Sequence, residues 1–232
     1  MSSYAFEPGP RPSLSIAGTD ARFPVHRIYC VGRNYAEHAR EMGSDPTREP
    51  PFFFQKPADA LIESGAVVPY PSRTADFHHE VELVIALSSG GKDLLTSNAL
   101  DCVFGYAVGN DFTRRDLQNA AKNAGHPWDT SKGFDNAAGI APIHRAVADQ
   151  LPAGRIWLSV NGALRQQGQL HELIWSVPEI ISELSGYFTL RAGDLIYTGT
   201  PAGVGPLQRG DHIECGIDGL GTLQQRIGSG AL

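Results

Sequence analysis

The chain has 232 residues, enough for one large domain or two small ones, and its net charge of -6 without any basic run argues against nucleic acid as a partner. Its 26 glycines and 16 prolines indicate many turns and short strands rather than a helical bundle. The three cysteines are far apart and no apolar run approaches membrane-spanning length, so we expect a compact cytoplasmic protein with reduced, mostly buried thiols and no membrane partner.

The N-terminal part of the sequence predicts an arm, a strand and a short helix. Residues 1–24 contain four prolines, which suits an extended arm or an edge segment, so we place the main domain at residues 25–232. An apolar strand is predicted over residues 28–31, and helical spacing follows over residues 34–42, where a glycine ends it. Residues 52–54 are all phenylalanine and predict a buried strand that a proline halts.

Strands and helices alternate along the rest of the sequence, with no internal repeat. A strand over residues 103–108 runs into Gly109-Asn110-Asp111, and a helix follows that Thr113 can cap, with Asp116 three positions later as in a weak capping box. Asn161-Gly162 is a hairpin signal. The other predicted elements are a strand at 78–85, a short helix at 97–101, a strand at 156–160, a helix at 177–185 and strands at 195–197 and 213–217.

The predicted strand at residues 78–85 carries two carboxylates two positions apart. Successive strand residues point to opposite faces, so Glu80 and Glu82 share a face with His78, while His79 points the other way. Two like charges on one face repel each other, and apolar surroundings favour a hard divalent cation between them, because such ions prefer oxygen ligands. The alternative is the solvated outer face of an edge strand, which needs no ion.

Asp111 offers a third carboxylate at the end of a later strand. If that strand lies beside the one with Glu80 and Glu82, three carboxylates converge, and such a set suits Mg²⁺ or Mn²⁺. Zinc is disfavoured because no cysteine or paired histidine has ligand spacing. Taken alone, Asp111 is more typical of a helix entry or a turn.

Two pairs of residues at i, i+3 on predicted helices supply further candidates. His38 and Glu41 lie on one helix face, where the carboxylate can orient the imidazole to deprotonate a water, although an ordinary surface contact has the same spacing. Arg115 and Gln118 share a face of the helix after Asp111. Arg115 can fork a substrate carboxylate, although simple exposure explains it as well.

Two residues outside these helices complete the candidate set. Lys132 can supply a positive charge to developing oxyanions, and its alternative is a solvated loop lysine. Thr200 lies in a glycine-rich turn after the strand at residues 195–197, and the turn can hold a small anion. The turn lacks the GK[ST] ending of a P-loop and the helix context of GxGxxG, so nucleotide binding is disfavoured.

In these segments the chain resembles the fumarylacetoacetate hydrolase family, in its acylpyruvate hydrolase branch. The segments follow one another in family order over nearly the whole chain. They are Val31-Gly32-Arg33-Asn34-Tyr35 with His38 and Glu41, Phe53-Phe54-Gln55-Lys56-Pro57, His79-Glu80-Val81-Glu82-Leu83, Gly109-Asn110-Asp111-Phe112-Thr113-Arg114-Arg115-Asp116 with Gln118, Lys132-Gly133-Phe134-Asp135, Val160-Asn161-Gly162 and Thr198-Gly199-Thr200-Pro201-Ala202-Gly203-Val204-Gly205.

The resemblance implies an α+β, β-rich fold with mixed strands rolled into a barrel-like or sandwich core, short helices and a lid helix, in a homodimer. It also implies a divalent metal ion, Mg²⁺ or Mn²⁺. The residues implied as ligands are Glu80, Glu82 and Asp111, those implied as catalytic are His38, Glu41 and Lys132, and those implied to bind substrate are Arg33, Arg115, Gln118 and Thr200.

The narrower resemblance is to hydrolases that cleave the β-diketo acid fumarylpyruvate to fumarate and pyruvate in bacterial gentisate degradation. In that chemistry the metal stabilises the pyruvate enolate, and His38, held by Glu41, activates the attacking water. Other interpretations are a general acylpyruvase, an oxaloacetate decarboxylase, which needs no attacking water, and an isomerase or decarboxylase of a longer muconate-like diacid. A non-catalytic binding protein that kept the fold is the alternative from another class.

Overall fold

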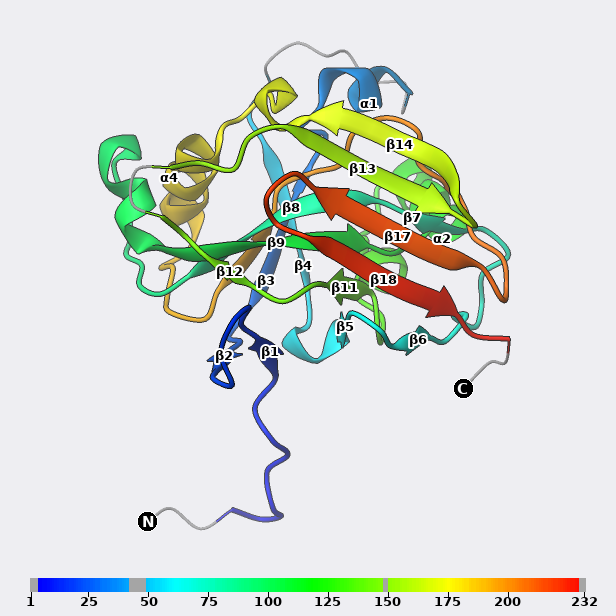
Figure 1. Cartoon of the computed structure of the whole chain (residues 1–232), viewed down its shortest axis with the longest axis horizontal. Helices are drawn as coiled ribbons and strands as arrows, with labels where there is room; N and C mark the ends of the chain where they lie inside the picture. The colour runs from blue at the N-terminus through cyan, green and yellow to red at the C-terminus, as the bar shows by residue number, and fades with distance from the viewer. Residues whose placement is uncertain (1–3, 42–48, 148–149, 230–232) are drawn as a thin grey trace.

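The computed structural model describes residues 4–41, 49–147 and 150–229, with the side chains of all of these except 39–41. Two sheets carry most of the described structure (Figure 1). The larger sheet is mixed, and its eight strands are, in spatial order, β4 (Phe52–Lys56), β3 (Ile28–Gly32), β15 (Leu195–Tyr197), β8 (Val81–Leu87), β9 (Val103–Asp111), β11 (Ala138–Ile140) and β5 (Leu61–Glu63), with β12 (His144–Arg145) beside β9.

The remaining strands form three smaller sheets. The five-stranded sheet has the order β14 (Ala163–Gln169), β13 (Arg155–Val160), β17 (His212–Ile217), β18 (Thr222–Ile227) and β6 (Val67–Val68). A three-stranded sheet has the order β10 (Thr113–Arg114), β7 (Phe77–His79) and β16 (Gly205–Pro206), and a hairpin joins β1 (Ser13–Ser15) to β2 (Arg22–Pro24).

The helices among the described residues are short. The α-helices are α1 (Ala36–Glu41), α2 (Arg115–Ala124), α3 (Asp129–Lys132) and α4 (Val177–Tyr187), and the 3₁₀ helices are η1 (Ala58–Ala60), η2 (Thr96–Cys102) and η3 (Leu170–Glu172). In the described part of the chain, none has the length and apolar character needed to cross a membrane. The β-rich α+β fold class predicted from the sequence is confirmed.

Apolar side chains cover both faces of the eight-stranded sheet. All seven residues of β8 are buried, and the six apolar ones alternate between two cores. Leu83 and Ile85 belong to the core that also contains side chains of β13 and α4, while Val84 belongs to a second core with Leu14 and Phe23 of the β1–β2 hairpin. Burial on both faces explains why the sequence of β8 is almost continuously apolar after its carboxylate.

Several predicted elements agree with the structure. The helix predicted at 177–185 is α4, and the short helix predicted at 97–101 is the 3₁₀ helix η2. Asn161 and Gly162 have φ angles of 52° and 77°, as a type I′ turn between β13 and β14 requires. All three cysteines are free and buried, as predicted.

Three local predictions are wrong. Of the two alternatives for residues 1–24, the extended arm is wrong for residues 13–24, which pair as the β1–β2 hairpin, although the described residues before them run away from the body (Figure 1). Thr113 does not cap α2, which has Arg114 at its N-cap without a side-chain bond, because the Thr113 hydroxyl faces the Asp111 carbonyl and Glu80 Oε1 instead. The three phenylalanines of β4 are half-buried rather than buried, since they border a cavity.

The single strand predicted at residues 78–85 is two strands in the structure. β7 pairs with β10 and β16, whereas β8 pairs with β9 and β15. Glu80 lies between them, where its N–H donates to Asn110 Oδ1 at 2.8 Å and its carbonyl accepts the Asp111 N–H at 2.8 Å. The chain therefore passes from one sheet to another at a charged residue. Two residues of β9, Asn110 and Asp111, bond the backbone N–H and the carbonyl of that residue.

Candidate functional site

Three carboxylates from separate segments meet in the interior. Glu80 lies at the break between β7 and β8, Glu82 lies on β8, and Asp111 ends β9, the antiparallel neighbour of β8. Each contributes an oxygen within 4.8 Å of the other two, and all three residues are buried. The solvated-edge alternative for this strand is therefore wrong, and we call these three residues the carboxylate cluster.

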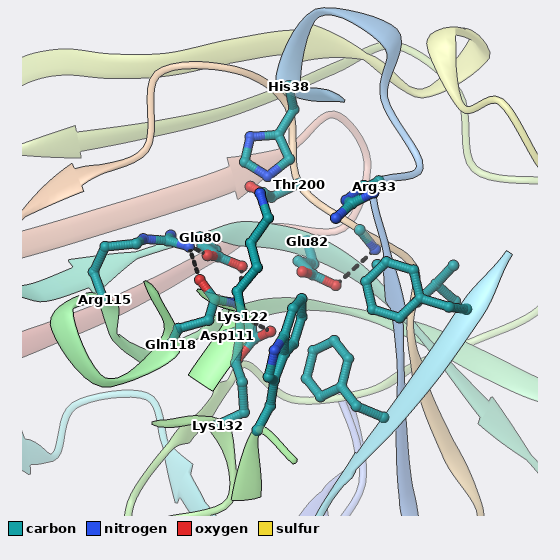
Figure 2. A pocket seen from close by; sticks show the side chains of 16 residues that line it. Arg33, His38, Glu80, Glu82, Asp111, Arg115, Gln118, Lys122, Lys132 and Thr200 are labelled. Atoms are coloured by element: carbon teal, nitrogen blue, oxygen red, sulfur yellow. Dashed lines mark hydrogen bonds and ion pairs between the residues drawn. The ribbon is translucent and has the colours of Figure 1, made fainter. Parts of the chain in front are cut away.

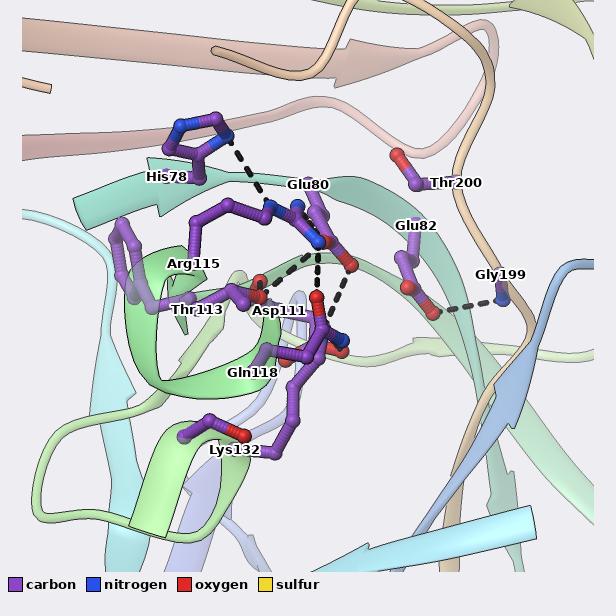
Figure 3. Close-up of polar contacts among 12 residues, drawn as sticks. His78, Glu80, Glu82, Asp111, Thr113, Arg115, Gln118, Lys132, Gly199 and Thr200 are labelled. Carbon is purple, nitrogen blue, oxygen red and sulfur yellow. Dashed lines mark hydrogen bonds and ion pairs between the residues drawn. The ribbon is translucent and has the colours of Figure 1, made fainter. Parts of the chain in front are cut away.

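Three cations face the carboxylate cluster. Lys132 Nζ lies 2.8 Å from Glu80 Oε2 and 2.7 Å from Asp111 Oδ2, and Arg115 pairs with Glu80 Oε1 (Figure 3). Lys56 Nζ lies 2.6 Å from Asp111 Oδ1. Glu80 and Asp111 each have an ion-pair partner at both oxygens, so their charges are matched on the protein side.

Neither of the two lysines is a surface residue. Lys132 ends α3 and is 2% exposed, so the solvated-loop alternative is wrong. Lys56 ends β4, is also 2% exposed and donates to the Phe112 carbonyl at 3.1 Å. No role was predicted for Lys56 from the sequence. The sequence did contain a hint, because Lys56 ends a strand of three phenylalanines that was predicted to be buried. A lysine in such a strand is almost never fully buried unless it has a charged partner.

The third carboxylate, Glu82, is the least compensated. Burial raises the pKa of Glu82 well above its ordinary value, and the charges of Asp111 and Glu80 add to the rise. Burial acts in the same direction on Glu80, but Lys132 and Arg115 outweigh it, so the pKa of Glu80 lies well below its ordinary value. A divalent cation among the three carboxylates would compensate Glu82 as well, so the donor set fits such an ion.

The turn after β15 supplies the hydrogen bond that positions Glu82. The Gly199 N–H donates to Glu82 Oε2 at 2.7 Å. Gly199 has a φ of 99°, and a Cβ there would come within 2.8 Å of Asn34 Cβ, so this position requires glycine. Asn34 in turn fixes the same segment by donating to the Thr198 carbonyl at 2.8 Å.

A small cavity of about 40 Å³ lies over the carboxylate cluster (Figure 2). We call it the inner cavity. It brings together most of the residues that the sequence singled out, namely His38, Arg33, Arg115, Gln118, Lys132 and Thr200 with the cluster itself. A more open cavity of about 600 Å³, the outer cavity, adjoins it and shares the walls Arg33, Phe52, Phe54, Trp128 and Lys132.

His38 enters the inner cavity from α1. His38 is 6% exposed and lies near Thr200 in Figure 2, so the surface position considered for it is wrong. The side chain of its predicted partner, Glu41, lies outside the described residues. Lys122 of α2 also lines the cavity, and no feature of the sequence had singled it out.

Arg33 stands where the inner and outer cavities meet. It follows β3 with a φ of 59°, a left-handed conformation that costs energy for a residue other than glycine and often marks turns and functional sites. Its guanidinium lies 5.4 Å from the Phe52 ring centroid, and Trp128 meets that ring edge-on at 5.3 Å. One cation and two aromatic rings therefore line this passage.

Arg115 and Gln118 lie buried on the face of α2 toward the cluster (Figure 3). The Arg115 guanidinium donates to Glu80 and to Gln118, and its Nε donates to His78 Nδ1 at 3.4 Å. The exposed-helix alternative for Arg115 is therefore wrong, and its contacts hold Glu80 in place. His79 is buried and faces the other way, toward β14, as strand alternation predicted.

The family model described as fumarylacetoacetate (FAA) hydrolase C-terminal matches residues 27–228, so the chain belongs to the fumarylacetoacetate hydrolase family. A crystal structure of fumarylpyruvate hydrolase from Pseudomonas aeruginosa in complex with Mn²⁺ and pyruvate matches with a TM-score of 0.95 and 49% identity, covering 97% of this chain and 99% of that one.

Curated relatives carry the names of other reactions. The mitochondrial oxaloacetate decarboxylase of Dictyostelium discoideum is 42% identical, covering 86% of this chain and 92% of the relative. The mitochondrial oxaloacetate tautomerase of Mus musculus is also 42% identical, covering 86% and 90%. The family thus includes relatives named for more than one reaction.

Replacing Lys56 should destabilise the fold through the loss of one charge. We expect Lys56→Met to lower the free energy of unfolding by about 3 kcal/mol, the lower end for breaking a buried ion pair, because Lys132 still faces Asp111. Urea unfolding measures this, with the exposed Lys92→Met as control, for which about 0.5 kcal/mol or less is expected. Equal stability of the two variants would show that the Lys56 ion pair contributes nothing.

Proposed function

We propose that this protein is a metal-dependent acylpyruvate hydrolase that cleaves fumarylpyruvate to fumarate and pyruvate. The observation that carries the proposal is the buried carboxylate cluster beside a cavity. Glu80, Glu82 and Asp111 would hold the ion, and a set of oxygen donors alone suits Mg²⁺ or Mn²⁺. The similarity to a hydrolase solved with Mn²⁺ and pyruvate supports both the ion and a keto-acid substrate.

The inner cavity is proposed to take the pyruvate end of the substrate. When bound, the metal would supply Lewis acidity at the carboxylate and 2-keto oxygens and so stabilise the charge that develops there. Lys132 and Arg115 keep Glu80 ionised, so its oxygens remain good donors for the ion. Lys132 and Lys56 hold the two oxygens of Asp111 in the same way. These cations thus orient the ligands and offset their mutual repulsion.

His38 is the proposed general base, with Glu41 as the residue that orients it. His38 takes a proton from a water, and the water oxygen bonds to the distal carbonyl carbon of the substrate. The bond between that carbon and the methylene carbon then breaks, and the electron pair stays with the pyruvate fragment as its enolate. Protonation of the enolate carbon gives pyruvate, and the acyl fragment leaves as fumarate. The burial of His38 beside the cavity supports this role.

The passage between the two cavities supports fumarylpyruvate over acylpyruvates in general. The fumaryl group is planar and ends in a second carboxylate. Phe52 and Trp128 offer flat apolar walls, and Arg33 offers a guanidinium that can pair with that carboxylate. An acylpyruvate with a simple alkyl group would leave Arg33 without an ionic partner from the substrate.

Conversion of oxaloacetate is the second candidate function. Relatives named oxaloacetate decarboxylase and oxaloacetate tautomerase are each 42% identical to this chain. Both reactions involve enol chemistry of a 2-keto acid and neither requires a water to attack a carbonyl. A non-catalytic binding protein, the candidate from another class, predicts neither turnover nor a need for His38.

The test of the proposal compares wild type and His38→Ala on fumarylpyruvate and oxaloacetate, with Mg²⁺ and with Mn²⁺, by measuring pyruvate release. Wild type should release pyruvate from fumarylpyruvate. His38→Ala should lose about 10²–10⁴-fold of this activity, the contribution typical of a general base, and less than about tenfold of any oxaloacetate decarboxylation. The exposed His212→Ala serves as control. No pyruvate from fumarylpyruvate would reject the proposal, and equal losses on both substrates would remove the role of His38.

The proposed role of Glu82 as a metal ligand can be tested by metal binding alone, without measuring turnover. Glu82→Gln keeps an acceptor for the Gly199 N–H, so the variant should fold, but it removes one anionic ligand. Calorimetric titration with Mn²⁺ should show an affinity that is lower by about tenfold to a hundredfold or more. Losing a residue that only supports a metal ligand already costs about this much, so losing a ligand should cost no less. The half-buried Glu214→Gln is the matched control. Unchanged Mn²⁺ affinity in the Glu82 variant would refute this ligand.

The substrate assignment predicts a selective effect at Arg33. Arg33→Gln should raise KM for fumarylpyruvate about tenfold or more, as the loss of a hydrogen bond to a charged group does, and leave KM for acetylpyruvate within about twofold. Arg73→Gln is the control, because Arg73 is exposed and shares the φ of 59°, which matches any backbone effect. Equal changes for both substrates would mean that Arg33 does not recognise the distal carboxylate.

A further inference from the structure

Gln166 is a buried polar residue to which the proposed reaction gives no role. It lies in β14 with no exposed surface, while Arg165 and Gln167 on either side are exposed. The pairing of β14 with β13 skips Arg165, so β14 has a bulge just before Gln166. A bulge re-aims the side chains beside it. Here the bulge turns Gln166 inward, toward the turn that contains Thr200.

The hydrogen bonds of Gln166 fix which way its amide points. Oε1 accepts the Val81 N–H at 3.1 Å and faces His79 Nδ1 at 2.9 Å. Nε2 donates to Thr200 Oγ1 and to the Pro201 carbonyl, both at 2.8 Å. A backbone N–H can only donate and a carbonyl can only accept, so both ends require the same orientation. The amide cannot flip without losing two bonds to the backbone.

This orientation determines what the Thr200 hydroxyl can do. Because Thr200 Oγ1 accepts from Gln166, its own hydrogen has to point elsewhere, and among the described residues Oγ1 donates to no acceptor. Thr200 is 2% exposed and lines the inner cavity. The carboxylate and keto oxygens of a 2-keto acid are acceptors only, so a ligand at that end of the cavity needs donors.

We propose that Gln166 is a positioning residue that makes Thr200 a hydrogen-bond donor to the bound keto acid, an inference that rests on the proposed function. Gln166 itself touches no substrate. It acts through Thr200, whose direction of donation it sets.

Two neighbouring donors in the same turn already donate to acceptors within the protein. The Thr198 hydroxyl donates to the Leu83 carbonyl at 3.0 Å, and the Gly199 N–H donates to Glu82. Thr200 differs from both because its buried partner is a donor. Thr198 and Gly199 thus bond to β8 and to the carboxylate cluster. The Thr200 hydroxyl is left to donate toward the inner cavity.

The test measures the affinity of the Mn²⁺-loaded protein for pyruvate by calorimetry, at alkaline pH. In Gln166→Glu both side-chain oxygens accept when ionised, so Thr200 has to donate to the glutamate rather than to the ligand. We expect Gln166→Glu and Thr200→Val each to weaken pyruvate binding by about tenfold to a hundredfold, and the double variant to be within about twofold of Gln166→Glu. Thr200→Ser, which keeps the hydroxyl, should bind within about threefold of wild type.

Gln167→Glu is the matched control, because it makes the same change at the next, exposed position and should bind pyruvate like wild type. Pyruvate affinity of Gln166→Glu within twofold of wild type, or effects of the two substitutions that multiply, would overturn the inference.

A second measurement needs no variant and decides the question if Gln166→Glu fails to fold. In a crystal structure of the wild-type protein with Mn²⁺ and pyruvate, Thr200 Oγ1 should lie about 2.7–2.8 Å from a pyruvate oxygen and remain bonded to Gln166 Nε2. An Oγ1 with no pyruvate oxygen in hydrogen-bond range overturns the inference. Pyruvate release from fumarylpyruvate by wild type is assayed in parallel: its absence rejects the proposed function, while turnover without the Thr200 contact rejects only the role of Gln166.

Discussion

A buried carboxylate can remain ionised in this interior only where a positive charge accompanies it, and this constraint organises the site. Removing one ion from water costs several kcal/mol even after the protein relaxes. Glu80 and Asp111 meet the constraint with cations from β4 and from the two consecutive helices α2 and α3, which lie more than 50 residues after β4 in the sequence. The positions of these elements, and of the strand break at Glu80, thus depend on charge pairing as well as on the apolar cores.

The charge count of the site suits an anionic ligand once a divalent ion is present. The three carboxylates and the three cations Lys56, Lys132 and Arg115 sum to zero when each has its ordinary charge. An added divalent cation would leave the group with an excess of two positive charges in a low-dielectric cavity, where an anion is strongly attracted. Carboxylates alone would bind the ion and repel the keto acid, so the buried lysines are as necessary to the proposed function as the ligands are.

The sequence predicted the local elements better than their connections. Period and turn chemistry located α4 and the Asn161-Gly162 hairpin, because both are decided by neighbours in the chain. The break at Glu80 was not predictable, since alternation continues across it and the partner of its N–H is Asn110. The burial of Lys132 was equally hidden, because its carboxylate partner Glu80 lies 52 positions away. The resemblance to a family grouped these residues, but the hydrogen bonds among them depend on the fold and could not be predicted from the sequence.

The two cavities divide the proposed chemistry between a common part and a variable part. The inner cavity, about 40 Å³, meets what every 2-keto acid presents, a carboxylate and a keto oxygen, with the cluster, its cations and the Thr200 hydroxyl. The outer cavity, about 600 Å³, meets the part that differs between substrates, with Arg33 and two aromatic rings at its entrance. Substitutions in the walls of the outer cavity can therefore change which substrate binds, and substitutions of His38 can change whether a water attacks it. Neither kind of substitution alters the contacts of the inner cavity with the keto-acid end.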